Sequence, residues 1–71
     1  MNDEYITHIK KDNLNRIIEF KTNKGNIYNF EMAKDAILFG KIKNAKIIKK
    51  DSGRINICQE DDTDFNDFPS F

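Results

Sequence analysis

The sequence contains one cysteine, one histidine, one proline, three glycines and no tryptophan. A lone Cys58 excludes a disulfide within the chain, and Cys58 with His8 cannot supply the four ligands of a structural zinc site. Gly25, Gly40 and Gly53 are isolated from one another, whereas a phosphate-binding loop needs clustered glycines. The sequence therefore predicts neither a metal site nor a cofactor.

Long apolar runs are also missing. No stretch approaches the roughly 18–20 apolar residues of a membrane span. The N-terminal residues 1–4 are polar and acidic, which is unlike the apolar segment of a signal peptide. The free thiol of Cys58 is typical of a reducing compartment. We therefore expect a cytoplasmic protein that makes no membrane contact.

The residues needed for catalysis are scarce. His8 and Cys58 are the only pair resembling a base and a nucleophile, and no acid partner in the sequence is placed to orient the histidine. We interpret them as a partly exposed strand histidine and a small apolar cysteine. The acidic residues 60–64 lack the glycine and the downstream glutamate of a calcium-binding loop. We therefore predict no catalytic residues and a protein that is not an enzyme.

Alternating apolar and polar residues predict five strands separated by turn signals. The strands are expected at residues 5–10, 16–22, 26–30, 42–49 and 54–58. After the third strand the period changes. Met32, Ala36 and Phe39, with Ala33 and Ile37 beside them, form the apolar stripe of a short amphipathic helix. Asn29 is suited to cap the start of this helix, and Gly40 to end it.

The resulting order, β-β-β-α-β-β, predicts an α+β fold: a small antiparallel sheet with one helix on one face. In the second strand, Ile18 and Phe20 should share one face and Ile17 the other. We assign residues 1–59 to the domain and residues 60–71 to an irregular acidic C-terminal tail. One short helix covers only part of a five-stranded sheet, so the tail or a second copy should cover the rest.

Charge is distributed unevenly along a chain whose net charge is zero. All 12 lysines and arginines lie within residues 10–54, whereas residues 58–71 hold five acids and no base. The basic hairpin, residues 41–54, is a candidate surface for a partner or for nucleic-acid phosphates. The candidate contacts are Lys43, Lys46, Lys49, Lys50 and Arg54. The alternative is that these lysines protect exposed strand edges from pairing.

The tail is rich in phenylalanine as well as in acids. Phe65, Phe68 and Phe71 recur every three residues, and burying one phenylalanine contributes about 1.5–3 kcal/mol. We expect them to dock on the sheet while the acids face the basic hairpin. The alternative is a short acidic aromatic motif that binds a groove on another protein.

Several short motifs carry a resemblance to a known family. They are residues 6–10, Asn15-Arg16-Ile17, residues 24–28, residues 36–40 and the segment Phe65-Asn66-Asp67-Phe68-Pro69. The chain resembles a family of short uncharacterised proteins of Gram-positive bacteria and their phages, described as a domain of unknown function and ending in Leu-x-x-Leu-Pro. Phenylalanine replaces both leucines here, and Asp64 stands where relatives have asparagine. The resemblance implies a small α+β domain with no known activity.

These observations lead to three functional hypotheses. The first is a non-enzymatic binding module that self-associates as a homodimer or binds another protein. The second is nucleic-acid or nucleotide binding through the basic hairpin. The third is a phage-encoded inhibitor of a host defence protein, which follows from the small size, the missing catalytic residues and the distribution of the family that the chain resembles.

Overall fold

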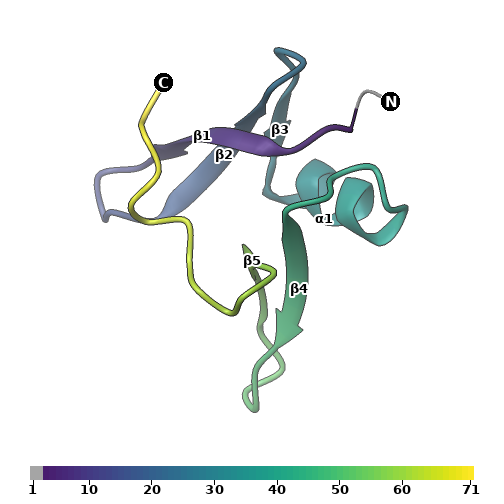
Figure 1. The fold of residues 1–71 in the computed structure, drawn as a ribbon. Helices are drawn as coiled ribbons and strands as arrows, with labels where there is room; N and C mark the ends of the chain where they lie inside the picture. Colours follow the sequence, from purple (N-terminus) through teal and green to yellow (C-terminus); the bar gives the residue numbers. More distant parts are fainter. Residues whose placement is uncertain (1–2) are drawn as a thin grey trace.

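The computed structural model describes residues 3–71 and contains five strands and one helix (Figure 1). In chain order they are β1 (Ile6–Lys11), β2 (Ile17–Thr22), β3 (Ile27–Asn29), α1 (Phe30–Leu38), β4 (Ala45–Lys49) and β5 (Ile55–Gln59). The order β-β-β-α-β-β confirms the predicted α+β fold class. The expectation about a signal peptide rests partly on residues 1–2, which lie outside the described residues. No helix within residues 3–71 is long and apolar enough to cross a membrane.

The strands form two antiparallel sheets instead of the single five-stranded sheet that the pattern suggested. One sheet has the order β1-β2-β3, and the other is the β4-β5 hairpin. Helix α1 packs against β2, β3 and β4, so it lies between the two sheets. Figure 1 shows the hairpin extending away from the larger sheet, while the C-terminal segment returns beside β1.

Polar contacts join the two sheets near the start of β4. The Asn44 side chain accepts a hydrogen bond from the Ile6 N–H at 2.9 Å and donates one to the Ile6 carbonyl at 3.0 Å. The Lys43 N–H donates to the Glu4 carbonyl at 2.8 Å. One asparagine therefore replaces a pair of ladder bonds at this junction, which fixes where the hairpin leaves the larger sheet.

The β1–β2 ladder contains two register shifts, which are typical of β-bulges. The first lets Ile6 and Ile9 both point into the core, although they are three positions apart. The second packs Ile17 against the core and leaves Ile18 40% exposed. Simple alternation predicted that Ile18 would share the inner face with Phe20, and this is wrong because the bulge reverses the alternation.

Helix α1 begins as predicted, and its core-facing side agrees only in part with the predicted stripe. The Asn29 side chain caps it by accepting a hydrogen bond from the Met32 N–H at 2.8 Å. The buried side chains are Ala33 and Ala36, and small residues there allow the helix to approach the sheets closely. The predicted stripe is therefore wrong at Met32 and Phe39, which are 50% and 80% exposed.

The hydrophobic core lies between the larger sheet, the helix and the hairpin, and it includes one residue from the tail. Its buried members are Ile6, Ile9, Phe20, Ala33, Ala36, Ile42, Ala45, Ile57 and Phe65. The Phe65 ring is fully buried and meets the edge of Phe20 at a centroid distance of 6.0 Å. Phe68 packs on Phe65 at 4.7 Å. The C-terminal residues are therefore part of the packing of this fold.

The end of the tail follows the outer edge of β1. The Ile9 N–H donates to the Pro69 carbonyl at 2.9 Å, and the Phe71 N–H donates to the Ile9 carbonyl at 3.1 Å. The Phe71 ring remains 36% exposed, with the ammonium groups of Lys10 and Lys21 about 6 Å from its centroid. These contacts cover an edge that would otherwise be open to strand pairing.

Candidate ligand-binding groove

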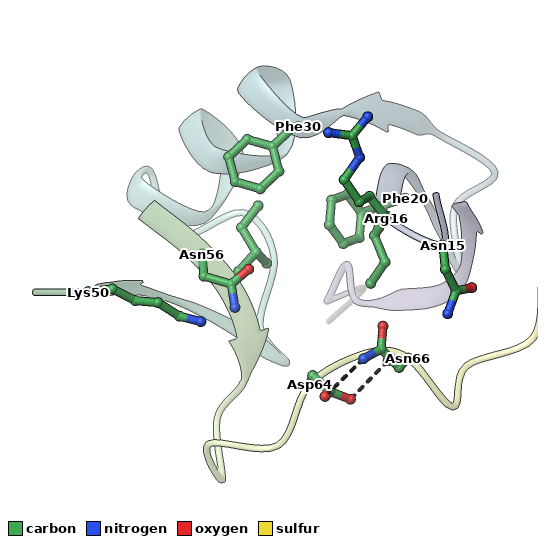
Figure 2. A pocket seen from close by; sticks show the side chains of 10 residues that line it. Asn15, Arg16, Phe20, Phe30, Lys50, Asn56, Asp64 and Asn66 are labelled. Atoms are coloured by element: carbon green, nitrogen blue, oxygen red, sulfur yellow. Dashed lines mark hydrogen bonds between the residues drawn. The ribbon is translucent and has the colours of Figure 1, made fainter. Parts of the chain in front are cut away.

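A pocket of about 370 Å³ opens between the start of β2, the hairpin and the tail (Figure 2). Its size is within the range of small-molecule sites in proteins. Apolar side chains from β2, α1 and β5 form its floor, and polar side chains from the turn before β2, the hairpin and the tail surround them. The lining residues are Asn15, Arg16, Ile17, Phe20, Phe30, Lys50, Asn56, Ile57, Asp64 and Asn66.

The floor of the pocket is an extension of the hydrophobic core. Phe20 and Ile57 are buried core residues, and Phe30 and Ile17 are half-buried and pack against that core. Figure 2 shows the Phe30 and Phe20 rings on the same side of the pocket, opposite the tail. A ligand that covers this floor would remove the half-exposed Phe30 and Ile17 surfaces from water, which is favourable.

The turn before β2 places two polar side chains at the pocket rim. Asn15 adopts φ 64°, a left-handed conformation that asparagine tolerates well. Asp12 holds this turn by accepting hydrogen bonds from the backbone N–H groups of Leu14 and Arg16 and from Arg16 Nε. The Arg16 backbone N–H, together with the other two donors, lowers the pKa of Asp12. Arg16 is therefore anchored through Nε while its side chain stays 70% exposed.

The tail and the hairpin supply the remaining polar groups. Asp64 accepts hydrogen bonds from the backbone N–H and the side-chain amide of Asn66, at 3.1 and 3.0 Å. Lys50 and Asn56 come from the hairpin, and the Lys50 side chain extends toward the pocket (Figure 2). Among the described residues that line the pocket, Asp64 is the only acid, and Arg16 and Lys50 are the bases.

A second hollow of about 460 Å³ adjoins the first and has a more apolar lining. It is lined by Asp12, Arg16, Ile17, Ile18, Asn29, Phe30 and Glu31. Because both hollows contain Arg16, Ile17 and Phe30, we treat them as one continuous groove. The groove exists because β3 pairs with β2 only as far as Glu19 opposite Asn29. The start of β2 therefore extends past the end of β3 and forms a wall.

The five predicted basic contacts lie in different parts of the hairpin. Lys46 is half-buried and forms an ion pair with Asp62 of the tail, which raises the pKa of Lys46. Lys43 is exposed near the start of the hairpin. At the other end, Lys50 and Arg54 flank the turn, where the Lys50 N–H donates to the Arg54 carbonyl at 2.8 Å. Of the five predicted bases, only Lys50 lines the groove.

Two other exposed bases of the hairpin lie beside Lys50. Lys49 precedes it on β4, and Arg54 faces it across the turn. Neither lines the groove. We call Lys49, Lys50 and Arg54 the basic tip of the hairpin. Lys50 is therefore the one residue that belongs to both the basic tip and the groove.

The two residues considered for catalysis are in environments that do not activate them. Burial raises the pKa of Cys58, so its thiol stays protonated near neutral pH and is a poor nucleophile. His8 Nδ1 lies 2.9 Å from the hydroxyl of Thr7, the preceding residue. Within residues 3–71, no group of three or more His, Cys, Asp or Glu side chains is arranged to hold a metal ion.

Three of the groove residues that the sequence analysis missed are asparagines. Asn15, Asn56 and Asn66 come from a turn, a strand and the tail, so no spacing in the sequence connects them. The only local signal was the turn-forming character of Asn15. Phe30 was expected at the end of a strand, but it is the first residue of α1 and contributes to both hollows.

Comparisons of this chain with protein-family models, with curated proteins and with solved structures found no match. The resemblance to a domain of unknown function therefore stays a prediction, and the functional argument rests on the geometry of the groove.

Proposed function

We propose that the protein is a non-enzymatic binding module whose ligand occupies the groove. One observation carries this proposal: polar side chains from the turn before β2, the hairpin and the tail converge on a half-exposed apolar floor. Ligand sites commonly combine an apolar lining with a few convergent polar groups. The raised pKa of Cys58 and the separate placement of His8 beside Thr7 favour binding over catalysis.

A fragment screen by NMR tests this proposal. The full chain is labelled with ¹⁵N and mixed with small aromatic acids, amines and neutral rings. We expect at least one chemical class to shift the signals of Asn15, Asn56 and Asn66 together, since these residues surround the same space. Gly25, in the turn between β2 and β3, lines neither hollow and is an internal control that should not move. If no class shifts these asparagines, or if shifts occur only outside the groove, the proposal is wrong.

A second candidate function is the binding of nucleic acid by the basic tip. Lys49, Lys50 and Arg54 are exposed around one turn, and Asp51 is the acid in that turn. Such a tip can neutralise phosphates, and the affinity should then fall steeply as salt increases. We expect Lys49→Glu with Arg54→Glu to weaken the binding of a labelled single-stranded oligonucleotide, measured by fluorescence anisotropy at several salt concentrations. Lys43→Glu, at the other end of the hairpin, should have a smaller effect.

A further inference from the structure

We propose that the groove binds an organic anion attached to a planar heteroaromatic ring, which is the chemistry of a nucleotide. This inference rests on the proposed function of the groove and names its ligand class. The anion would lie near Lys50 and the ring over the floor formed around Phe30. The argument depends on three properties of the lining: where its bases lie, which apolar side chains form its floor, and how many amides surround it.

The anionic end is assigned from Lys50. Its backbone is fixed by two hydrogen bonds across the turn, because its N–H donates to Arg54 and its carbonyl accepts from the Gly53 N–H, both at 2.8 Å. The exposed side chain therefore starts from a well-defined position and extends toward the pocket (Figure 2). Lys49 and Arg54 add positive potential at this end, which attracts an anion and raises its local concentration.

Asp64 is the acid of the first hollow, where Lys50 lies, whereas Asp12 and Glu31 line the second hollow. Asp64 does not cancel the preference for an anion near Lys50. Asp64 belongs to the tail, and its carboxylate already accepts two hydrogen bonds from Asn66. In Figure 2 the Lys50 side chain enters from the hairpin, whereas Asp64 and Asn66 lie together on the tail. Arg16 adds a second base at the rim and is held there by Asp12. A phosphate or carboxylate near the hairpin would therefore meet Lys50 before Asp64.

The ring is assigned from the floor. Phe30 is half-buried and contributes to both hollows, so part of its surface is available to a ligand. Ile17 and Ile57 add aliphatic surface to the same lining. An aromatic ring stacks well on such a surface, and stacking on an aromatic side chain tolerates different bases.

The heteroatoms of the ring are assigned from the amides. Asn15, Asn56 and Asn66 surround the floor, and a side-chain amide carries both donors and an acceptor, although Asn66 already donates one hydrogen bond to Asp64. A purely hydrocarbon ring would leave these groups facing apolar surface, which is unfavourable. Ring nitrogens, carbonyls and amino groups match them. Three amides around an apolar floor therefore favour a nucleobase over a phenyl group.

Titrations monitored by NMR test this ligand class on the full chain. The probes are adenosine monophosphate, adenosine without phosphate, ribose 5-phosphate without a base, and a short single-stranded oligodeoxyadenylate. We expect adenosine monophosphate to shift the signals of Asn15, Asn56 and Asn66 and to bind more tightly than adenosine or ribose 5-phosphate. If the oligonucleotide binds more tightly than the mononucleotide, the source of the base is a nucleic-acid strand; equal or weaker binding identifies a free nucleotide. Either ordering supports the ligand class.

Two substitutions sharpen the test. Lys50→Gln should weaken adenosine monophosphate binding about tenfold, the usual effect of losing a charge-assisted hydrogen bond. Lys49→Gln removes the same charge from the neighbouring position, which does not line the groove, and should change the affinity less than about twofold. Equal effects of the two substitutions would show that only general charge matters and would overturn the inference.

The remaining outcomes separate this inference from the proposed function. If ribose 5-phosphate binds as tightly as adenosine monophosphate, the groove does not recognise a ring and the inference fails. If no nucleotide probe binds but another class from the fragment screen shifts the groove asparagines, the inference fails and the binding module stands. If neither set of compounds shifts these signals, both proposals fail.

Discussion

The carboxylate of Glu4 is enclosed by three donors from different segments. Thr22 Oγ1 lies 2.7 Å from it, Asn26 Nδ2 2.8 Å and the Tyr28 hydroxyl 3.1 Å. Burial raises the pKa of Glu4, but these hydrogen bonds outweigh it and hold the pKa below its ordinary value of 4.5. Burial, followed by the contact with Glu4, raises the pKa of Tyr28. Through these hydrogen bonds, Glu4 joins the N-terminal segment to β2 and β3.

Replacing Glu4 with glutamine should destabilise the protein by about 1–3 kcal/mol at neutral pH, because buried donors lose their charged acceptor. The ionised Glu4 stabilises the folded chain fully above about pH 4.5, and this stabilisation is lost as the pH falls through the lower folded pKa. The difference in unfolding free energy between the wild type and Glu4→Gln should therefore shrink below pH 4.5. Urea unfolding at several pH values measures it.

Glu31→Gln is a suitable control for this measurement, because the Glu31 side chain is 76% exposed. It should change the unfolding free energy little at any pH. A gap between wild type and Glu4→Gln that stays constant down to pH 3 would contradict the role given to the Glu4 carboxylate. Asp12 and Asp61, whose pKa values are also lowered, contribute acid sensitivity to both proteins and cancel in the comparison.

At the scale of elements, the tail has two kinds of attachment. Phe65 contributes a fully buried ring to the core, whereas Pro69 and Phe71 make backbone hydrogen bonds to Ile9 at the edge of β1. The first attachment excludes water from a packed interior, and the second completes a sheet edge. The two can be separated by experiment because they involve different residues.

Phe65→Ala should destabilise the protein by about 3–5 kcal/mol, as expected when a buried phenylalanine is truncated. The ring contacts both Phe20 and Phe68, so the substitution leaves a cavity beneath the groove. Phe71→Ala is the matched control, because that ring is 36% exposed. Chemical unfolding of both variants measures the difference. If both substitutions lower the free energy of unfolding equally, Phe65 contributes no more to stability than the exposed Phe71, and the prediction is wrong.

Deleting residues 69–71 should leave Phe65 packed but remove the acceptor of the Ile9 N–H. We therefore expect hydrogen exchange at the Ile9 amide to become faster, while exchange at the Lys50 amide, bonded to Arg54 within the hairpin, stays unchanged. Exchange measured by NMR reports both amides in one experiment. Unaltered protection of Ile9 would show that the tail does not protect the edge of β1.

At the scale of the whole molecule, exposed apolar side chains gather at the end of α1. Leu38 and Phe39 are 70% and 80% exposed, and Met32 on the same helix is 50% exposed. A surface of this kind is costly to leave in water. The homodimer remains a prediction, and this surface is where two copies of the chain would pack together.

If the protein self-associates through this surface, Leu38→Ser with Phe39→Ser should lower the mass in solution. Sedimentation velocity over a range of concentrations measures it. Leu14→Ser is the matched control, because Leu14 is 71% exposed on a different turn and should not alter the mass. A wild-type protein that stays monomeric at every concentration would rule out the homodimer.

Features fixed by neighbouring residues could be predicted from the sequence. The cap at Asn29 and the left-handed turn residues Asn15, Gly25 and Gly53 follow from local preferences. Those signals set the order of the strands and the helix, because each acts within a few residues.

Features that depend on tertiary contacts could not be predicted. The bulge that turns Ile17 inward depends on the pairing with β1, and the rotation of α1 depends on how closely Ala33 and Ala36 approach the sheets. Glu4 was read as part of a polar terminus because its partners lie in β2 and after it. The groove combines residues from four segments, so no local pattern marks it.

The two sheets share no strand, and the groove lies across the seam between them. A ligand that contacts Asn15 on one side and Asn56 on the other would bridge the two sheets and hold the hairpin against the larger sheet. A bound ligand would then stabilise the arrangement of the two sheets beyond the residues that it touches. Because a chain this small buries little surface on folding, the free energy of ligand binding would add a substantial share to its free energy of unfolding.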